Sequence, residues 1–198
     1  MFGVRTGFFD YLGYLCEAGR EAFADPDATC ATLASLGVQT KAENLNLASI
    51  GVSDVTGTAT VVRTITNVAD KRIEWEAEVE APAGFRVKVS PSEVRLAPGE
   101  SATVQITFTR TDAAIGQWSF GELTWEGSGY EVRSPIALRA KEVAFPAEVT
   151  GTGTAGSVDI PVTFGYSGAY TADAHGLVAA NLTEANVVDD PATTSTPR

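Results

Sequence analysis

Apolar and polar residues alternate one by one through the middle of the chain, from Leu45 to Arg139. The clearest example is residues 73–80, where Ile73 and Trp75 alternate with glutamates at every second position. A period of two is typical of a β-strand that buries one face and exposes the other. Turn-forming sequences interrupt the alternation at residues 56–57, 68–71, 81–84, 97–100, 113–116 and 126–129. The pattern therefore predicts about seven short strands.

Short strands at this spacing predict a mainly β protein. We expect residues 45–140 to form an antiparallel β-sandwich of the fibronectin type III or immunoglobulin-like kind. The inward-facing positions of such a sandwich make its core, and truncating a large residue there typically costs about 2–5 kcal/mol. The core residues that we expect are Val61, Ile65, Trp75, Val79, Val87, Val104, Ile106 and Phe108.

Two places complicate the alternation. Arg63 has the inward parity of its strand, so we expect its long side chain either to reach the sheet edge or to pair with an acid. Trp118 and Trp125 have opposite parities on one predicted strand. A β-bulge at Gly121 would switch the inward face between them. Without a bulge, one tryptophan must point outward.

The first 44 residues lack this alternation and are expected to form a short helical lead-in. Asp10 is a plausible N-cap for a first helix, and Gly19 suits its end. Asp25 is a second N-cap candidate with Pro26 at the first helical position, and Gly37 suits the end of that helix. Two short helices are therefore predicted ahead of the sandwich.

The chain after the predicted sandwich is β-rich but short. Residues 141–190 suggest an incomplete β-extension, with strands around 147–152 and 157–165. Residues 191–198 have the composition of a disordered tail. The predicted order of parts is thus a helical lead-in, a sandwich, a partial extension and a tail.

Charge limits the classes of partner. The chain has 198 residues, with 14 lysines and arginines against 25 acids and a net charge of −11. A nucleic-acid surface needs clustered basic residues, so nucleic acid is not expected as a partner, and anionic membranes are disfavoured likewise. A spanning helix needs roughly 18 consecutive apolar residues, and the sequence has no such run. The first residues, MFGVRTGFF, do not have the pattern of a signal peptide.

The two cysteines and the single histidine limit the metal sites and catalytic sites that the chain can form. Cys16, Cys30 and His175 are too few for a three- or four-ligand Cys/His metal site. The cysteines therefore form a disulfide, which we favour, or remain two buried thiols. The disulfide would stabilise the fold by roughly 3 kcal/mol in the chain-entropy model. His175 is expected to be a structural or surface residue, because no serine-hydrolase elbow accompanies it.

Two further groups are candidates for binding. Glutamates at positions 74, 76, 78 and 80 share one strand face, where we expect a solvated row that converges on no metal or catalytic point. Trp118, Trp125 and Tyr130 lie near one predicted hairpin and could form an aromatic contact surface for sugars. Their mixed parity suggests that at least one of them is core. No cofactor is expected.

The chain resembles the C-terminal region of subtilisin-like serine peptidases, the subtilases. The resemblance begins at "FFDYLGYLC" (8–16) and continues through "NLNLASIGV" (44–52), "TVVRTITNVAD" (60–70), "APAGFRVKVSPSEVRLAPGESATVQITFT" (81–109) and "RSPIAL" (133–138). "VTFGYSGAYTADAHGLV" (162–178) looks like the continuation in bacterial, often actinobacterial, members. The family's serine motif, approximately "GTSMAxP", is absent, as are its aspartate and histidine motifs.

This resemblance implies a non-catalytic accessory region of an extracellular peptidase, acting in stability, substrate access or assembly. The implied partner is a subtilase catalytic domain, with protein substrates as further candidates. Phe8, Phe9, Tyr11 and Tyr14 would then meet that domain, or fold back on the sandwich, or remain an exposed patch. The alternative is an independent extracellular binding or adhesion module with a carbohydrate or protein ligand.

Overall fold

The structure is a computed structural model, which describes residues 2–146, 149–152, 156–166, 168–171, 173 and 176. The chain divides into two units, Met1–Ser167 and Gly168–Arg198. All helices and strands of the described residues lie in the first unit. They are β1 (Phe2–Val4), α1 (Phe8–Ala18), η1 (Arg20–Ala22), α2 (Pro26–Ser35), η2 (Ala42–Asn44), β2 (Ile50–Val55), β3 (Thr58–Asn67), β4 (Ile73–Glu80), β5 (Phe85–Ser90), β6 (Glu93–Leu96), β7 (Ser101–Arg110), β8 (Trp118–Gly127), β9 (Tyr130–Ala140), β10 (Val143–Ala144) and β11 (Thr163–Phe164).

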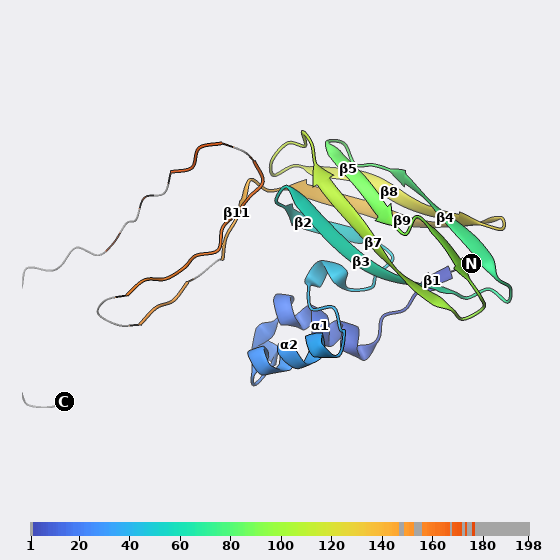
Figure 1. The fold of residues 1–198 in the computed structure, drawn as a ribbon, viewed down its shortest axis with the longest axis horizontal. Helices are drawn as coiled ribbons and strands as arrows, with labels where there is room; N and C mark the ends of the chain where they lie inside the picture. The colour runs from blue at the N-terminus through green and yellow to red at the C-terminus, as the bar shows by residue number, and fades with distance from the viewer. Residues whose placement is uncertain are drawn as a thin grey trace, which may run out of the picture. The chain divides into compact units, whose positions relative to one another are not determined.

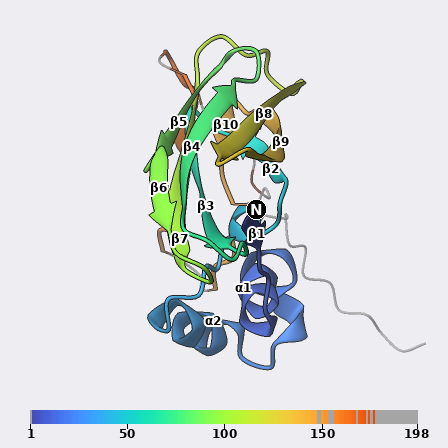
Figure 2. The ribbon, with the colours of Figure 1, turned by 90° about the vertical axis from the view of Figure 1, so that its right-hand side faces the viewer.

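Two sheets enclose the core (Figures 1 and 2). One has the strand order β1-β3-β7-β5 and the other the order β2-β9-β8-β4-β6. Every neighbouring pair is antiparallel except β2 and β9, which run parallel with Ile50 opposite Ile136. The fold is thus a fibronectin type III-like or immunoglobulin-like β-sandwich, as the alternation predicts, with one parallel pair that the turns did not indicate.

The alternating apolar residues of both sheets fill the space between them. Most of the expected core residues are buried, with Trp75 and Phe108 fully inaccessible to solvent. Val79 is an exception at 36% exposed, and Val87 is only partly buried. The reason at Val79 is local, because β6 covers β4 only between Ile73 and Glu76 and leaves the end of β4 as an open edge.

The stretch between the turns at 81–84 and 97–100 forms two strands. β5 pairs with β7 in the four-stranded sheet, whereas β6 pairs with β4 in the five-stranded sheet. Pro91 and Ser92 separate them, and proline has no N–H to donate to a ladder. The chain therefore crosses from one sheet to the other at this point.

No bulge occurs at Gly121. The pairing of β8 with β9 is regular from Trp118 opposite Arg139 to Gly127 opposite Tyr130. Of the two alternatives, the one without a bulge is confirmed, and the outward tryptophan is Trp118. Gly121 instead allows a close approach, because a Cβ there would lie 2.3 Å from the carbonyl oxygen of Glu80.

Gly121→Ala is expected to destabilise the sandwich by about 1–3 kcal/mol, since the backbone around Glu80 must move to admit the methyl group. The control is Gly51→Ala on β2 of the same sheet, where an added Cβ meets no atom within 4 Å. Urea unfolding followed by circular dichroism would measure both. Equal losses in the two variants would contradict a steric role for Gly121.

The two helices form as predicted, with one shift. α1 begins three residues earlier than expected, so Asp10 lies inside it, and its Oδ2 accepts a hydrogen bond from the Gly7 N–H at 2.7 Å. Asp25 caps α2 as expected, since its Oδ1 accepts from the Ala28 N–H at 3.0 Å. A disulfide joins Cys16 to Cys30 across α1 and α2, with Cα atoms 5.7 Å apart.

Arg63 ties the lead-in to the sandwich. Its buried guanidinium forms no ion pair with an acid among the described residues. It donates instead to the carbonyl oxygens of Glu43 and Val62 at 2.8 Å, Leu47 at 3.1 Å and Ser49 at 3.2 Å. Burial lowers the pKa of Arg63 to about 10, and the nearby Glu43 charge opposes this shift. The side chain therefore remains charged at neutral pH.

Two asparagines complete this joint along β3. Asn44 Oδ1 accepts from the Val62 N–H and Asn46 Oδ1 from the Thr64 N–H, both at 2.9 Å. The Asn46 Nδ2 donates to the carbonyls of Arg5 at 2.9 Å and Thr64 at 3.0 Å. The side-chain amides thus take the place of a neighbouring strand just beyond the end of β1.

The described part of the C-terminal extension contains two short strands, and the second lies within the expected 157–165. β10 and β11 pair antiparallel over two residues each, and Gly165 N–H donates to the Glu142 carbonyl at 2.7 Å. The first strand lies before the expected 147–152, of which residues 149–152 are not in a strand. The expected tail, 191–198, lies outside the described residues.

Candidate interaction surfaces

The first turn of α1 is apolar and exposed. Phe8, Phe9 and Tyr11 are each more than half exposed, and the Phe8 and Phe9 rings meet edge to face at 5.8 Å. Gly13 fixes which side of α1 faces inward, because a Cβ there would lie 2.2 Å from the carbonyl oxygen of Gln39. We call Phe8, Phe9 and Tyr11 the helix patch.

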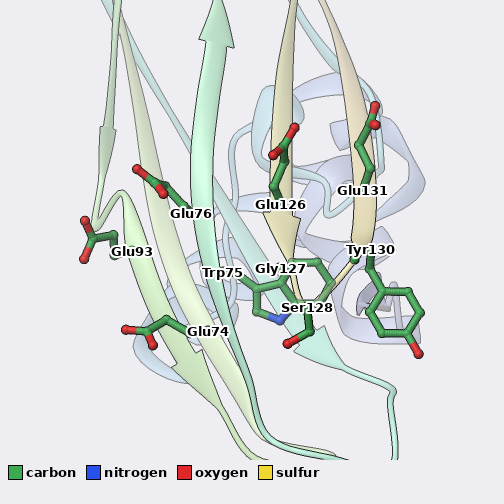
Figure 3. Close-up of a pocket in the computed structure, with 10 residues that line it drawn as sticks. Glu74, Trp75, Glu76, Glu93, Glu126, Gly127, Ser128, Tyr130 and Glu131 are labelled. Atoms are coloured by element: carbon green, nitrogen blue, oxygen red, sulfur yellow. The ribbon is translucent and has the colours of Figure 1, made fainter.

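The outer face of the five-stranded sheet is strongly acidic. Strand pairing sets Glu93 of β6 opposite Glu76 of β4, Glu76 opposite Glu126 of β8, and Glu126 opposite Glu131 of β9. This places four glutamates in one row across four strands (Figure 3). Like charges directly opposite each other in a sheet are destabilising. The row therefore opposes folding, and the core must offset its cost.

Arg133 partly neutralises this face. Its Nε donates to Glu122 Oε1 at 2.7 Å, and it lies 3.7 Å from Glu131. The hydrogen bond with Glu122, and then the charges of the glutamates, raise the pKa of Arg133. Glu76, Glu93 and Glu126 form no ion pair with a described residue.

A hollow of about 650 Å³ opens beside this row (Figure 3). Its walls include the tip of the β8–β9 hairpin, and Tyr130 lies over Trp75 with the ring centres 6.4 Å apart. Lys71 Nζ lies 5.8 Å from the centre of the Tyr130 ring. Among the described residues, no three acidic, histidine or cysteine side chains are grouped to hold a metal ion. The glutamates point along the face rather than converge.

The three aromatic residues expected to form one contact surface are separated. Trp125 is 1% exposed and belongs to the core, whereas Trp118 is 45% exposed on the outer face. Tyr130 lies at the opposite end of the β8–β9 hairpin from Trp118, roughly 30 Å away at 3.3 Å per residue. The next residue of β8 on this face is Phe120, which is also exposed.

His175 lies outside the described residues. No described helix has both the length and the apolar character to cross a membrane.

Residues 44–138 match the family model of the fibronectin type-III domain. The chain is 35% identical over 130 residues to a subtilisin-like serine protease S of Lotus japonicus, covering 65% of this chain and 17% of that protein. It is 34% identical over 145 residues to a CO(2)-response secreted protease of Arabidopsis thaliana, covering 67% and 18%. A Salmonella enterica SafA pilin–SafB chaperone complex matches with a TM-score of 0.39 and 15% identity, over 54% of this chain and 55% of that one.

These findings place a fibronectin type III-like domain in this chain and relate it to subtilisin-like proteases. The chain spans less than a fifth of the length of these two relatives. Both are plant proteins, so the expected bacterial, actinobacterial type finds no support in them.

Proposed function

We propose that this chain is a non-catalytic accessory region of a subtilisin-like serine protease, and that its helix patch packs on the catalytic domain. The region would support the stability, substrate access or assembly of that enzyme outside the cell. The similarity to two subtilisin-like proteases supports the choice of enzyme family. The helix patch is the observation that supports a docked domain.

Exposed aromatic residues of this size are costly in water and are typical of interaction sites. Phe8 and Phe9 are adjacent in the first turn of a short helix, whose buried residues Gly13 and Cys16 lie in its later turns. The joint at Arg63 fixes the 43–49 connection to the sandwich, and the Ala42 N–H just before that connection donates to Glu17 Oε2 of the helix at 2.6 Å. A domain packed on the patch would therefore be held at a defined angle to the sandwich.

A chimeric enzyme tests the proposal. This chain would replace the matching segment of the Lotus japonicus protease, and the half-life of casein hydrolysis at elevated temperature would be compared with that of the same enzyme lacking the segment. We expect the chimera to outlast the deletion at least about tenfold. Phe8→Ser with Phe9→Ser should remove most of that gain, because a lost apolar contact of about 1.4 kcal/mol is a factor of ten.

Phe120→Ser is the matched control, because Phe120 is equally exposed but lies on the β8 face. It should leave the half-life of the chimera unchanged. This chain alone should not react with a fluorophosphonate serine probe. Labelling of the isolated chain, or a chimera no more stable than the deletion, would contradict the proposal.

A further inference from the structure

A second exposed apolar surface lies at one end of the outer face of the five-stranded sheet. Trp118 is 45% exposed and Phe120 is 71% exposed, and both point outward from β8. Ile115 lies just before β8 and is also exposed. Its backbone forms an isolated parallel β-bridge with Ala140, the residue after Arg139. We call Ile115, Trp118 and Phe120 the strand patch. The helix patch is on another element and does not include these residues.

Arg139 is held over this patch in advance of any partner. Its guanidinium carbon lies 5.2 Å from the centre of the Trp118 ring. Its Nε donates to the Ser53 carbonyl at 3.0 Å, and Asp54 lies 3.8 Å from Nη2. Tryptophan and arginine are the residue types most often found to dominate binding energy at protein interfaces. Since the side chains are already ordered, binding would cost little conformational entropy.

The charges of the same face indicate what kind of partner fits. Its outward positions carry eight glutamates, at 74, 76, 78, 80, 93, 122, 126 and 131, and three arginines, at 95, 133 and 139. A second copy of this chain would bring these glutamates against one another, and like charges across an interface disfavour binding. A basic partner would relieve the repulsion within the Glu76–Glu126 row.

We propose that this face binds an extended, basic polypeptide segment. An apolar residue of the segment packs on Trp118 and Phe120, and its lysines or arginines meet the Glu76–Glu126 row. Phe120 and Glu126 are six residues apart on β8, which is roughly 20 Å. A partner segment of about six to eight extended residues spans that distance. This inference does not depend on the packing of the helix patch against a catalytic domain.

The probe is a synthetic peptide of about twelve residues with two leucines at one end, lysine at every second position after them, and serine elsewhere. Trp118 reports its binding by fluorescence, because Trp75 and Trp125 are buried. Isothermal titration on the full chain gives the affinity at low and at moderate salt. We expect binding that weakens with salt, and none by a peptide with glutamate in place of lysine.

The variants separate the apolar contact from the charges. Trp118→Ala and Phe120→Ser should each weaken binding about tenfold, and Glu76→Gln with Glu126→Gln about tenfold together with a smaller salt dependence. Glu21→Gln, an exposed charge on η1, is the control for net charge and should bind as the unaltered chain does. Near-ultraviolet circular dichroism verifies that each variant is folded.

Three results would overturn the proposal. The first is that the lysine peptide does not bind. The second is that Glu21→Gln weakens binding as much as the two glutamate changes of the face, which would indicate attraction to net charge alone. The third is a concentration-dependent dimer in sedimentation that Trp118→Ala abolishes, which would make a second copy the occupant. Phe9→Ser should leave peptide binding unchanged, so a failure of the accessory-region proposal would be seen separately.

Discussion

Arg63→Ala is expected to lower the free energy of unfolding by about 3–5 kcal/mol, because several part-buried carbonyls lose their hydrogen-bond donor at once. The lost side chain donates to carbonyls of both the 43–49 connection and β3. Those carbonyls would be left without a donor, at about 1–3 kcal/mol for each one that water cannot reach. The lowered pKa of Arg63 reflects the cost of burying its charge, which these hydrogen bonds offset.

Urea unfolding followed by tryptophan fluorescence would measure this loss. Arg63→Lys is the control, because lysine keeps the charge but concentrates its donors at one point. It should recover less than half of the lost stability, since one ammonium nitrogen would replace the three guanidinium nitrogens that donate to four carbonyls. A loss below about 1 kcal/mol in Arg63→Ala would show that water replaces the guanidinium.

Trp125→Ala is expected to destabilise the sandwich by about 3–5 kcal/mol, the usual cost of removing a large aromatic residue from a core. Trp118→Ala should cost less than about 1 kcal/mol, because half of its surface is already in contact with water. The two residues lie on the same strand and differ mainly in the face from which they project. Thermal unfolding of the two variants in parallel measures the difference. Similar melting temperatures would contradict the assignment of Trp125 to the buried face of β8 and of Trp118 to its exposed face.

The local rules of the sequence account for much of the fold. Alternation predicts the strands that bury Trp75 and Phe108, and capping residues predict α2 because its Asp25 N-cap acts within one turn. The sequence places the start of α1 three residues too late. The true N-cap is Gly7, which has no side chain to mark it and instead donates its backbone N–H to Asp10.

Other features depend on contacts between distant segments. The residues around Gly121 in the sequence suggest a bulge. The glycine is in fact required because the backbone of Glu80, forty-one positions earlier, packs closely against it. The parity of Arg63 marks it as unusual, but its acceptors belong to a connection with no regular pattern. Likewise the sequence shows the glutamates of β4, while the register that brings Glu93 and Glu126 beside them is a property of the folded sheet.

The lead-in contacts β3 twice, once near its start through β1 and once near its end through Asn46, and the two contacts are neighbours on β3. β1 pairs with β3 up to Val4 opposite Ile65, and Asn46 then joins Arg5 to Thr64. A segment attached at one point can rotate about that point, whereas a second attachment nearby restricts the rotation. Force applied to α1 is therefore shared between both attachments and passes into the sheet as a whole. The sandwich therefore sets the orientation of the lead-in.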